Sequence, residues 1–179
     1  MNCPDMEKKP ICSGARHLFG LFLRRQQGAS ALELALILPV FLIIVFGILD
    51  FGHAWYMRQM ISNASREGAR YGTRYQTDSS GSRILPQSLT PSIANYVKNS
   101  STDNGGNGGF GLNSLLPSDA SPQVTVTGPG VTETNKDNLV GEDLTVTVSA
   151  TKNWLVISNF ISSLGTSKTI TVATTMKCE

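Results

Sequence analysis

The most apolar part of the chain is residues 34–49, where no charged residue occurs and Leu, Ile, Val and Phe dominate. Glu33 lies directly before this run and Asp50 directly after it. An α-helix rises about 1.5 Å per residue, so roughly 20 residues cross a hydrocarbon core of about 30 Å. The pattern therefore predicts one membrane-spanning helix, which we place at residues 29–57.

Four residues within this predicted helix have properties that bear on packing. Pro39 removes one backbone hydrogen bond and predicts a kink, which membrane helices tolerate better than soluble ones. Gly47 and Gly52 allow either flexibility or close contact with another helix. Asp50 falls near the outer interface, where a solvated or locally paired carboxylate is expected and pairing with a partner protein is the alternative.

Residues 58–76 keep helical spacing without proline, so the helix is predicted to continue beyond the membrane. Apolar or small residues recur at three- and four-residue steps and form one face: Met57, Met60, Ile61, Ala64, Gly68, Tyr71 and Tyr75. A second, basic stripe consists of Arg58, Arg66, Arg70 and Arg74, with Glu67 able to pair with Arg70. Either the apolar face packs against the chain's own C-terminal domain and the arginines are solvated, or this helix contacts another protein. Contact of the arginines with lipid headgroups is a further alternative.

The remainder of the chain predicts a small α+β domain. Residues 77–122 are rich in Ser, Gly and Asn and have room for one short helix at 92–98. Apolar residues alternate with Thr and Ser at 123–127, 144–151 and 169–175, which is typical of half-buried antiparallel strands. Helical spacing at 153–164 predicts a helix between the last two strands of this 123–179 domain. Glycines at 106, 108 and 111 match a dinucleotide fingerprint formally, but the preceding strand and following helix are missing.

Charge placement predicts the orientation in the membrane. Residues 1–28 form a basic leader with Lys8, Lys9, Arg16, Arg24 and Arg25 against Asp5 and Glu7. Basic excess before a membrane helix favours a cytoplasmic N-terminus and an outward C-terminal domain.

The net charge of +2 is too small to indicate nucleic-acid binding. A cleaved signal peptide ending at Gly52-His53-Ala54 is the competing interpretation, although its apolar core would be at the upper limit of length.

Catalytic chemistry is hard to find in this sequence. His17 lies before the predicted anchor and His53 lies at its outer edge, so the two cannot easily share a site. No nucleophile elbow, P-loop, zinc-protease or redox cysteine motif occurs. We therefore predict no enzymatic activity, no cofactor, no metal and no small-molecule substrate. Cys178 would lie across the membrane from Cys3 and Cys12, so it is expected to be either an incidental cysteine near a frayed end or an intermolecular thiol.

The junction before the anchor is the most informative segment. A carboxylate just inside a membrane helix is costly, so Glu33 is a functional candidate. The alternative is a capping box, in which Ser30 and Glu33 satisfy each other's backbone N–H groups at a helix start. Gly28 followed five residues later by Glu33, between a basic leader and an apolar helix, resembles the processing site of type IV prepilins. The continuation through Pro39, Asp50-Phe-Gly52 and Ala64-Ser-Arg66-Glu-Gly-Ala-Arg70 resembles the TadE-like family of minor pseudopilins of tight-adherence (Flp) pili.

The resemblance implies a pilin-like α+β fold and a specific fate for the chain. A prepilin peptidase would cut after Gly28 and leave Ala29 as the N-terminus, and Glu33 would support processing and assembly. The implied partners are this peptidase, other pseudopilins, pilus-assembly proteins and membrane lipid, at the bacterial inner membrane with the C-terminal domain in the periplasm. Leu34 stands where the major Flp pilins carry tyrosine, which favours a minor pseudopilin. Met6 is an alternative start. An unprocessed, membrane-anchored structural or binding domain is the second hypothesis.

Overall fold

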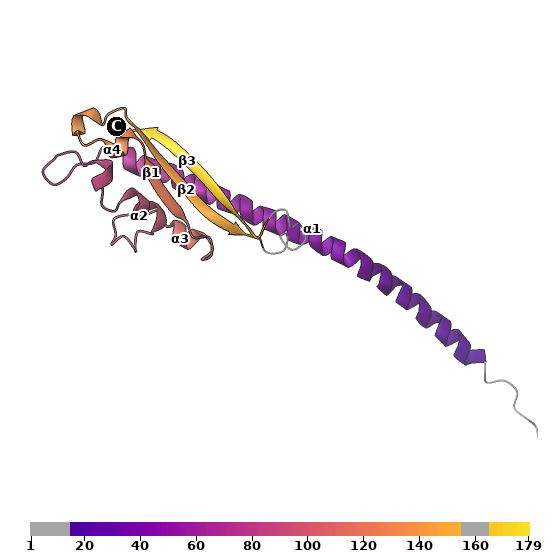
Figure 1. Cartoon of the computed structure of the whole chain (residues 1–179). Helices are drawn as coiled ribbons and strands as arrows, with labels where there is room; N and C mark the ends of the chain where they lie inside the picture. Colours follow the sequence, from indigo (N-terminus) through magenta and orange to yellow (C-terminus); the bar gives the residue numbers. More distant parts are fainter. Residues whose placement is uncertain (1–14, 155–164) are drawn as a thin grey trace, which may run out of the picture. The chain divides into compact units, whose positions relative to one another are not determined.

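The computed structural model describes residues 15–154 and 165–179, with side chains described from Gly28 onward. Its first element is α1 (Ala15–Thr73), a single α-helix of 59 residues that continues through Pro39 (Figure 1). The predicted continuous helix is confirmed, although it begins before the predicted anchor and ends at Thr73 rather than near residue 76. The chain divides into two compact units, Met1–Val45 and Phe46–Glu179, which we describe separately.

The described part of the first unit is an apolar helix with its side chains exposed. Leu34 is 62% exposed, and the other large side chains from Leu32 to Ile44 are exposed as well. An 18-residue window within Gly28–Thr73 has a mean hydropathy of 2.8, and none of it is buried. Among the described residues, α1 is the one helix that is long and apolar enough to cross a membrane. This is consistent with a single-pass anchor.

The second unit contains an antiparallel sheet with strand order β1-β2-β3. Its strands are β1 (Gln123–Thr127), β2 (Asp143–Asn153) and β3 (Ser167–Lys177). Along β2 the predicted alternation is confirmed, because the side chains at 144, 146, 148 and 150 are buried whereas those at 145, 147 and 149 are half-buried. Central Val146 pairs with Val126 on one side and Thr174 on the other.

Short helical segments fill the connections. They are η1 (Pro86–Ser88), α2 (Ile93–Lys98), α3 (Leu112–Leu115), α4 (Pro129–Thr132) and η2 (Lys136–Asn138). The predicted helix at 92–98 is confirmed as α2, and its start is capped by Ser92, whose Oγ accepts a hydrogen bond from the Asn95 backbone N–H at 3.3 Å. The helix predicted at 153–164 lies outside the described residues from 155 onward, and Asn153 ends β2.

The C-terminal part of α1 supplies one wall of the core. Met57, Ile61 and Ala64 are fully buried, so packing of the apolar face against the chain's own domain is confirmed. Met60 and Tyr71 are partly buried, but Tyr75 lies beyond the helix and is 57% exposed, so its assignment to this face is wrong.

Small residues allow α1 to approach the sheet closely. A Cβ at Gly68 would lie 3.3 Å from Val146 Cγ1, and one at Gly72 would lie 3.2 Å from Leu144 Cδ1. Ser65 Oγ donates to the Val146 carbonyl and also lies 2.8 Å from Thr174 Oγ1. Because later residues of α1 face earlier residues of β2, the helix runs antiparallel to β2. The N-terminal end of this packed segment therefore lies beside the C-terminal end of β2.

Candidate functional site

The predicted processing junction lies inside α1. Gly28, Ala29 and Glu33 are all helical, and all three are exposed. Ser30 is also within the helix, so it does not act as an N-cap in this structure, and the capping-box alternative is wrong here. Glycine within a helix is about 1 kcal/mol less favourable than alanine. Gly28 therefore lowers the local stability of the helix at this point.

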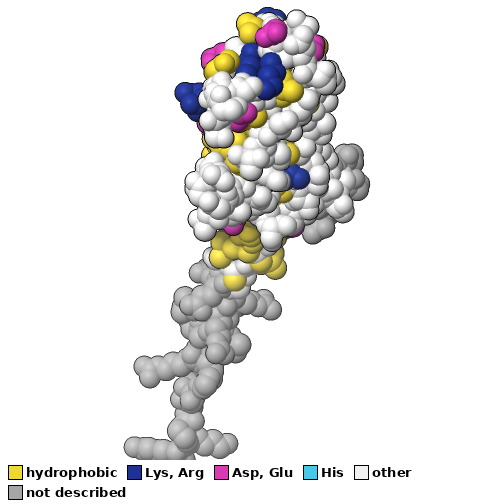
Figure 2. Space-filling view, turned by 90° about the vertical axis from the view of Figure 1, so that its left-hand side faces the viewer, with side chains coloured by type: hydrophobic (Ala, Val, Ile, Leu, Met, Phe, Trp, Pro, Cys, Tyr) yellow, Lys and Arg dark blue, Asp and Glu magenta, His cyan; other side chains and the backbone are white. Residues whose placement is uncertain are grey.

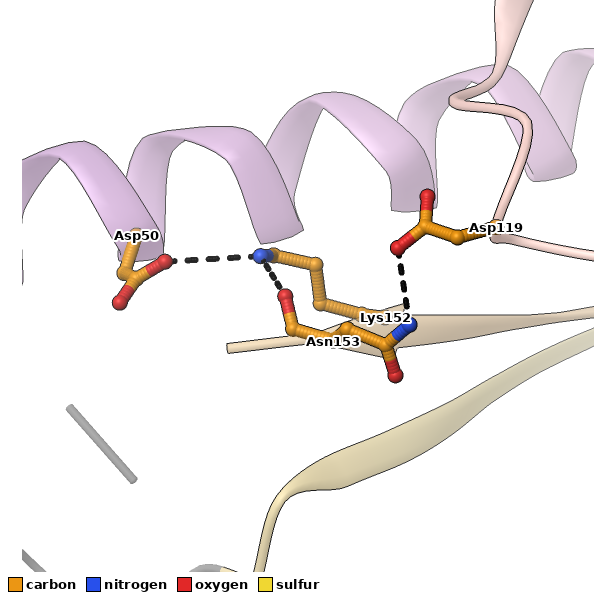
Figure 3. Close-up of polar contacts among 4 residues, drawn as sticks. All are labelled: Asp50, Asp119, Lys152 and Asn153. Carbon is orange, nitrogen blue, oxygen red and sulfur yellow. Dashed lines mark hydrogen bonds and ion pairs between the residues drawn. The ribbon is translucent and has the colours of Figure 1, made fainter. Parts of the chain in front are cut away.

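Asp50 lies at the boundary between the exposed apolar helix and the folded domain. It is fully buried and paired within the chain, so the expectation of a solvated or locally paired carboxylate is confirmed in its locally paired form. Its Oδ1 lies 3.5 Å from the Nζ of Lys152 at the end of β2, and both side chains are almost completely buried (Figure 3). Lys152 also donates to the Asn153 carbonyl. The side-chain amide of Asn153 in turn donates to Asp119 at 2.8 Å.

Lys152 was missed as a site residue, although the sequence holds a signal for it. The alternation of buried positions on β2 runs through 144, 146, 148 and 150, and the next position in that period is 152. A lysine at a position predicted to be buried requires a partner, because an unpaired buried charge is very costly. Asp50, at the end of an apolar run, likewise requires a partner of opposite charge.

The arginine stripe remains on the outside of the domain. Arg58, Arg66, Arg70 and Arg74 are all exposed. The predicted Glu67–Arg70 pair is not among the ion pairs of the described side chains, and Glu67 instead accepts a hydrogen bond from the Tyr96 hydroxyl at 3.3 Å. Burial, together with the neighbouring Glu67 charge, raises the pKa of Tyr96.

A pair of stacked rings joins this stripe to α2. The rings of Tyr71 and Tyr96 lie 4.0 Å apart and almost parallel. The Tyr71 hydroxyl donates to the Pro91 carbonyl at 2.9 Å. The α2 segment is therefore fixed against α1, and the side chains of Arg66 and Arg70 border a shallow groove beside Tyr96.

The C-terminal residues are part of the fold, so the expectation of a frayed end is wrong. The backbone N–H of Glu179 donates to the Thr73 carbonyl at 3.0 Å, and Arg83 donates to the Glu179 carbonyl. Cys178 is a free thiol with only 3% of its surface exposed. Burial raises the pKa of this thiol above the ordinary value of 9.0. An intermolecular disulfide would require the thiol to leave the core.

Taken together, these features define the class: an α+β protein in which one helix has exposed apolar side chains from Leu32 to Ile44 and forms part of the domain core at its C-terminal end. Within this class, residues 28–70 match the family model for TadE-like protein, which confirms the resemblance inferred from the sequence. TadE-like proteins are structural components associated with the tight-adherence pilus system. The matched segment covers most of the exposed apolar helix and its continuation into the core, whereas the sheet lies outside it.

No curated protein and no solved structure gave a significant match to the chain. Within the described residues, no group of three or more His, Cys, Asp or Glu side chains is arranged to hold a metal ion.

Proposed function

We propose that the protein is a minor pseudopilin that is processed by a prepilin peptidase after Gly28 and takes part in assembling tight-adherence pili. The observation that carries this proposal is the extent of the family match, which begins at Gly28 and runs to residue 70. In this proposal the leader ends at the first matched residue, and residues 29–57 cross the bacterial inner membrane.

The chemistry of the junction supports a role for Glu33 after cleavage. Cutting after Gly28 creates an α-amino group on Ala29, whose pKa of about 7.7–8.0 leaves it mostly protonated at neutral pH. A membrane is a poor solvent for an unpaired charge. The exposed Glu33 carboxylate of a neighbouring pseudopilin can neutralise this amine, which would favour side-by-side assembly of anchors.

The rest of the anchor supports the same proposal. Nothing among the described residues lies within 4 Å of a Cβ added at Gly47 or Gly52, so both glycines leave open surface where another helix can approach. The basic leader favours a cytoplasmic N-terminus and a periplasmic domain. We therefore propose other pseudopilins and pilus-assembly proteins as partners, with contacts along the anchor and the exposed arginine stripe.

The structure weighs against release of the domain by cleavage after Ala54. Such a cut would remove Asp50 and leave Lys152 buried without its carboxylate. It would also expose the start of the helical segment that packs against β2. The second candidate is an unprocessed anchored domain, which shares every feature of the fold and differs only in the fate of the leader.

The deciding experiment is the mass and N-terminal residue of the protein isolated from membranes of a host with its own prepilin peptidase. We expect a chain beginning at Ala29, and we expect Gly28→Val to block processing. Glu33→Ala should impair processing or assembly, whereas Glu33→Asp, which keeps the charge, should impair it less. Lys136→Gln serves as a control because this exposed side chain lies outside both the anchor and the arginine stripe.

An intact leader in the presence of an active peptidase would overturn the proposal and favour the unprocessed anchor. A chain beginning at Trp55 would instead identify a signal peptide. Normal processing and assembly in the Glu33→Ala variant would remove the assigned role of Glu33.

A further inference from the structure

A pocket of about 440 Å³ opens beside the point where α1 enters the domain. Its walls come from α1, from the end of β2 with the residue after it, and from the start of β3. They include Phe51, Trp55 and Arg58 on α1, Trp154 after β2, and Lys168 and Ile170 on β3. The pocket therefore combines large apolar surfaces with basic groups, and neither the family match nor the processing chemistry assigns it a role.

The basic groups of this pocket, which include Lys152, outnumber their acidic partners among the described side chains. Lys168 lies directly opposite Lys152 across the β2–β3 ladder, an arrangement of like charges that is unfavourable. Asp50 pairs with Lys152, but Arg58 and Lys168 have no ion pair among the described side chains. The sequence of residues 155–164, which connects β2 to β3, contains no Asp or Glu. An anion entering the pocket would relieve this repulsion.

The apolar walls indicate what kind of molecule carries the anion. Phe51 is 67% exposed and Trp55 is 54% exposed, and both follow the 34–49 apolar run on the same helix. Aromatic rings that directly follow a membrane-spanning apolar segment favour the headgroup region. On the face shown in Figure 2, hydrophobic side chains gather at the lower edge of the described surface, whereas basic side chains gather toward the opposite edge.

We propose that this pocket binds the headgroup of an anionic phospholipid, with Arg58 and Lys168 contacting the phosphate and Phe51, Trp55 and Ile170 contacting the glycerol and upper acyl chains. A lipid is favoured over a free phosphate because apolar side chains account for much of the wall and a small anion would leave them exposed to water. The inference rests on membrane anchoring by α1 but not on processing at Gly28.

The chain provides its own probe, because its two tryptophans, Trp55 and Trp154, both line the pocket. The full-length protein is reconstituted in vesicles of phosphatidylcholine and phosphatidylglycerol in which only one of the two lipids carries brominated acyl chains. Bromine quenches tryptophan fluorescence at short range. Vesicle co-flotation is measured on the same samples, so failure of the anchor is recognised separately from failure of the pocket.

At equal mole fraction, we expect brominated phosphatidylglycerol to quench the tryptophan fluorescence at least about two-fold more strongly than brominated phosphatidylcholine. Two basic side chains near anionic headgroups are sufficient for a preference of this size. The excess should fall in Arg58→Gln and Lys168→Gln and persist in Arg74→Gln, a matched exposed basic residue outside the pocket. It should also weaken in the wild-type protein at high salt, which needs no substitution.

Equal quenching by the two lipids in floated vesicles would overturn the proposal, as would an excess unchanged by both pocket variants. Inorganic phosphate at millimolar concentration is added in a further sample. Loss of the excess with phosphate, at constant ionic strength, would show that the pocket takes a free anion rather than a lipid. Quenching by neither lipid would place the pocket away from the bilayer and would also overturn the proposal.

Discussion

Asp50 and Lys152 show how a buried charge pair can fix a position rather than add stability. Removing two charges from water is expensive, and their attraction often does no more than offset that cost. Breaking such a pair is different, because the remaining charge stays buried without compensation. The pair joins one turn of α1 to the C-terminal end of β2, so it selects one alignment of the helix on the sheet.

This argument predicts the behaviour of the single and double substitutions. Asp50→Asn and Lys152→Met should each lower the free energy of unfolding by about 3–5 kcal/mol, since each removes one partner of a buried ion pair. The double variant should lose less than the sum of the two, which reports their coupling. The measurement is denaturant unfolding of the full chain in detergent micelles. Lys177→Met is the control, because its ion pair with Asp143 is 3.0 Å long but exposed, and it should change stability by less than about 1 kcal/mol.

Additive losses in the double variant would contradict coupling between Asp50 and Lys152. A loss in the Lys177 control as large as in Lys152→Met would show that the burial of the pair is irrelevant.

At the scale of elements, α1 changes its surroundings along its length without changing its conformation. Its first described side chains are exposed and apolar, whereas its last four turns present small residues to the sheet. The close approach at Gly68 is the tightest, since an added Cβ would lie 2.5 Å from Val97 Cγ2. Glycine therefore has two uses in one helix: open surface near the anchor and close packing inside the domain.

The two uses are separated by matched substitutions. Gly68→Ala should lower the free energy of unfolding by about 1–3 kcal/mol, because the new methyl group overpacks Val97 and Val146. Gly52→Ala is its control in the same helix, where a Cβ meets nothing within 4 Å, so stability should be unchanged or slightly higher. Thermal unfolding followed by circular dichroism measures both. Equal stability of the two variants would contradict the packing described for Gly68.

The elements that the sequence predicted well are those with long, regular patterns. Alternation located all three described strands within two residues of their ends, and Ser92 located the start of α2. Single residues in contact across long separations were harder to predict. The Asp50–Lys152 pair spans 102 positions, and the hydrogen bond from Glu179 to Thr73 joins the chain's last residue to the end of α1. No local pattern encodes such partners. The sequence could therefore indicate that a buried charged residue needs a partner, but it could not identify that partner.

At the scale of the whole molecule, the proposed cleavage changes the chemistry of the chain as well as its length. Cys3 and Cys12 precede Gly28, and Cys178 lies in the folded domain. Removal of the leader would therefore reduce the thiols from three to one. The one that remains is buried against Gly130, where an added Cβ would lie 2.8 Å from the Cys178 sulfur.

We expect alkylation under denaturing conditions to find one thiol in the protein from a host with prepilin peptidase and three when the peptidase is absent. Three thiols in both hosts would contradict processing at Gly28.

In the folded, processed chain the thiol should react slowly at pH 8, because burial restricts access and raises the pKa of Cys178 above 9.0, which lowers the thiolate fraction. The rate should continue to rise as the pH passes 9. The raised pKa also fixes the sign for stability: the folded state holds this proton more tightly than the unfolded state, so stability is complete below the unfolded pKa and falls as the pH rises above it. Cys178→Ala should remove that part of the alkaline loss, and rapid alkylation of the folded chain at pH 8 would show that the thiol is accessible rather than enclosed.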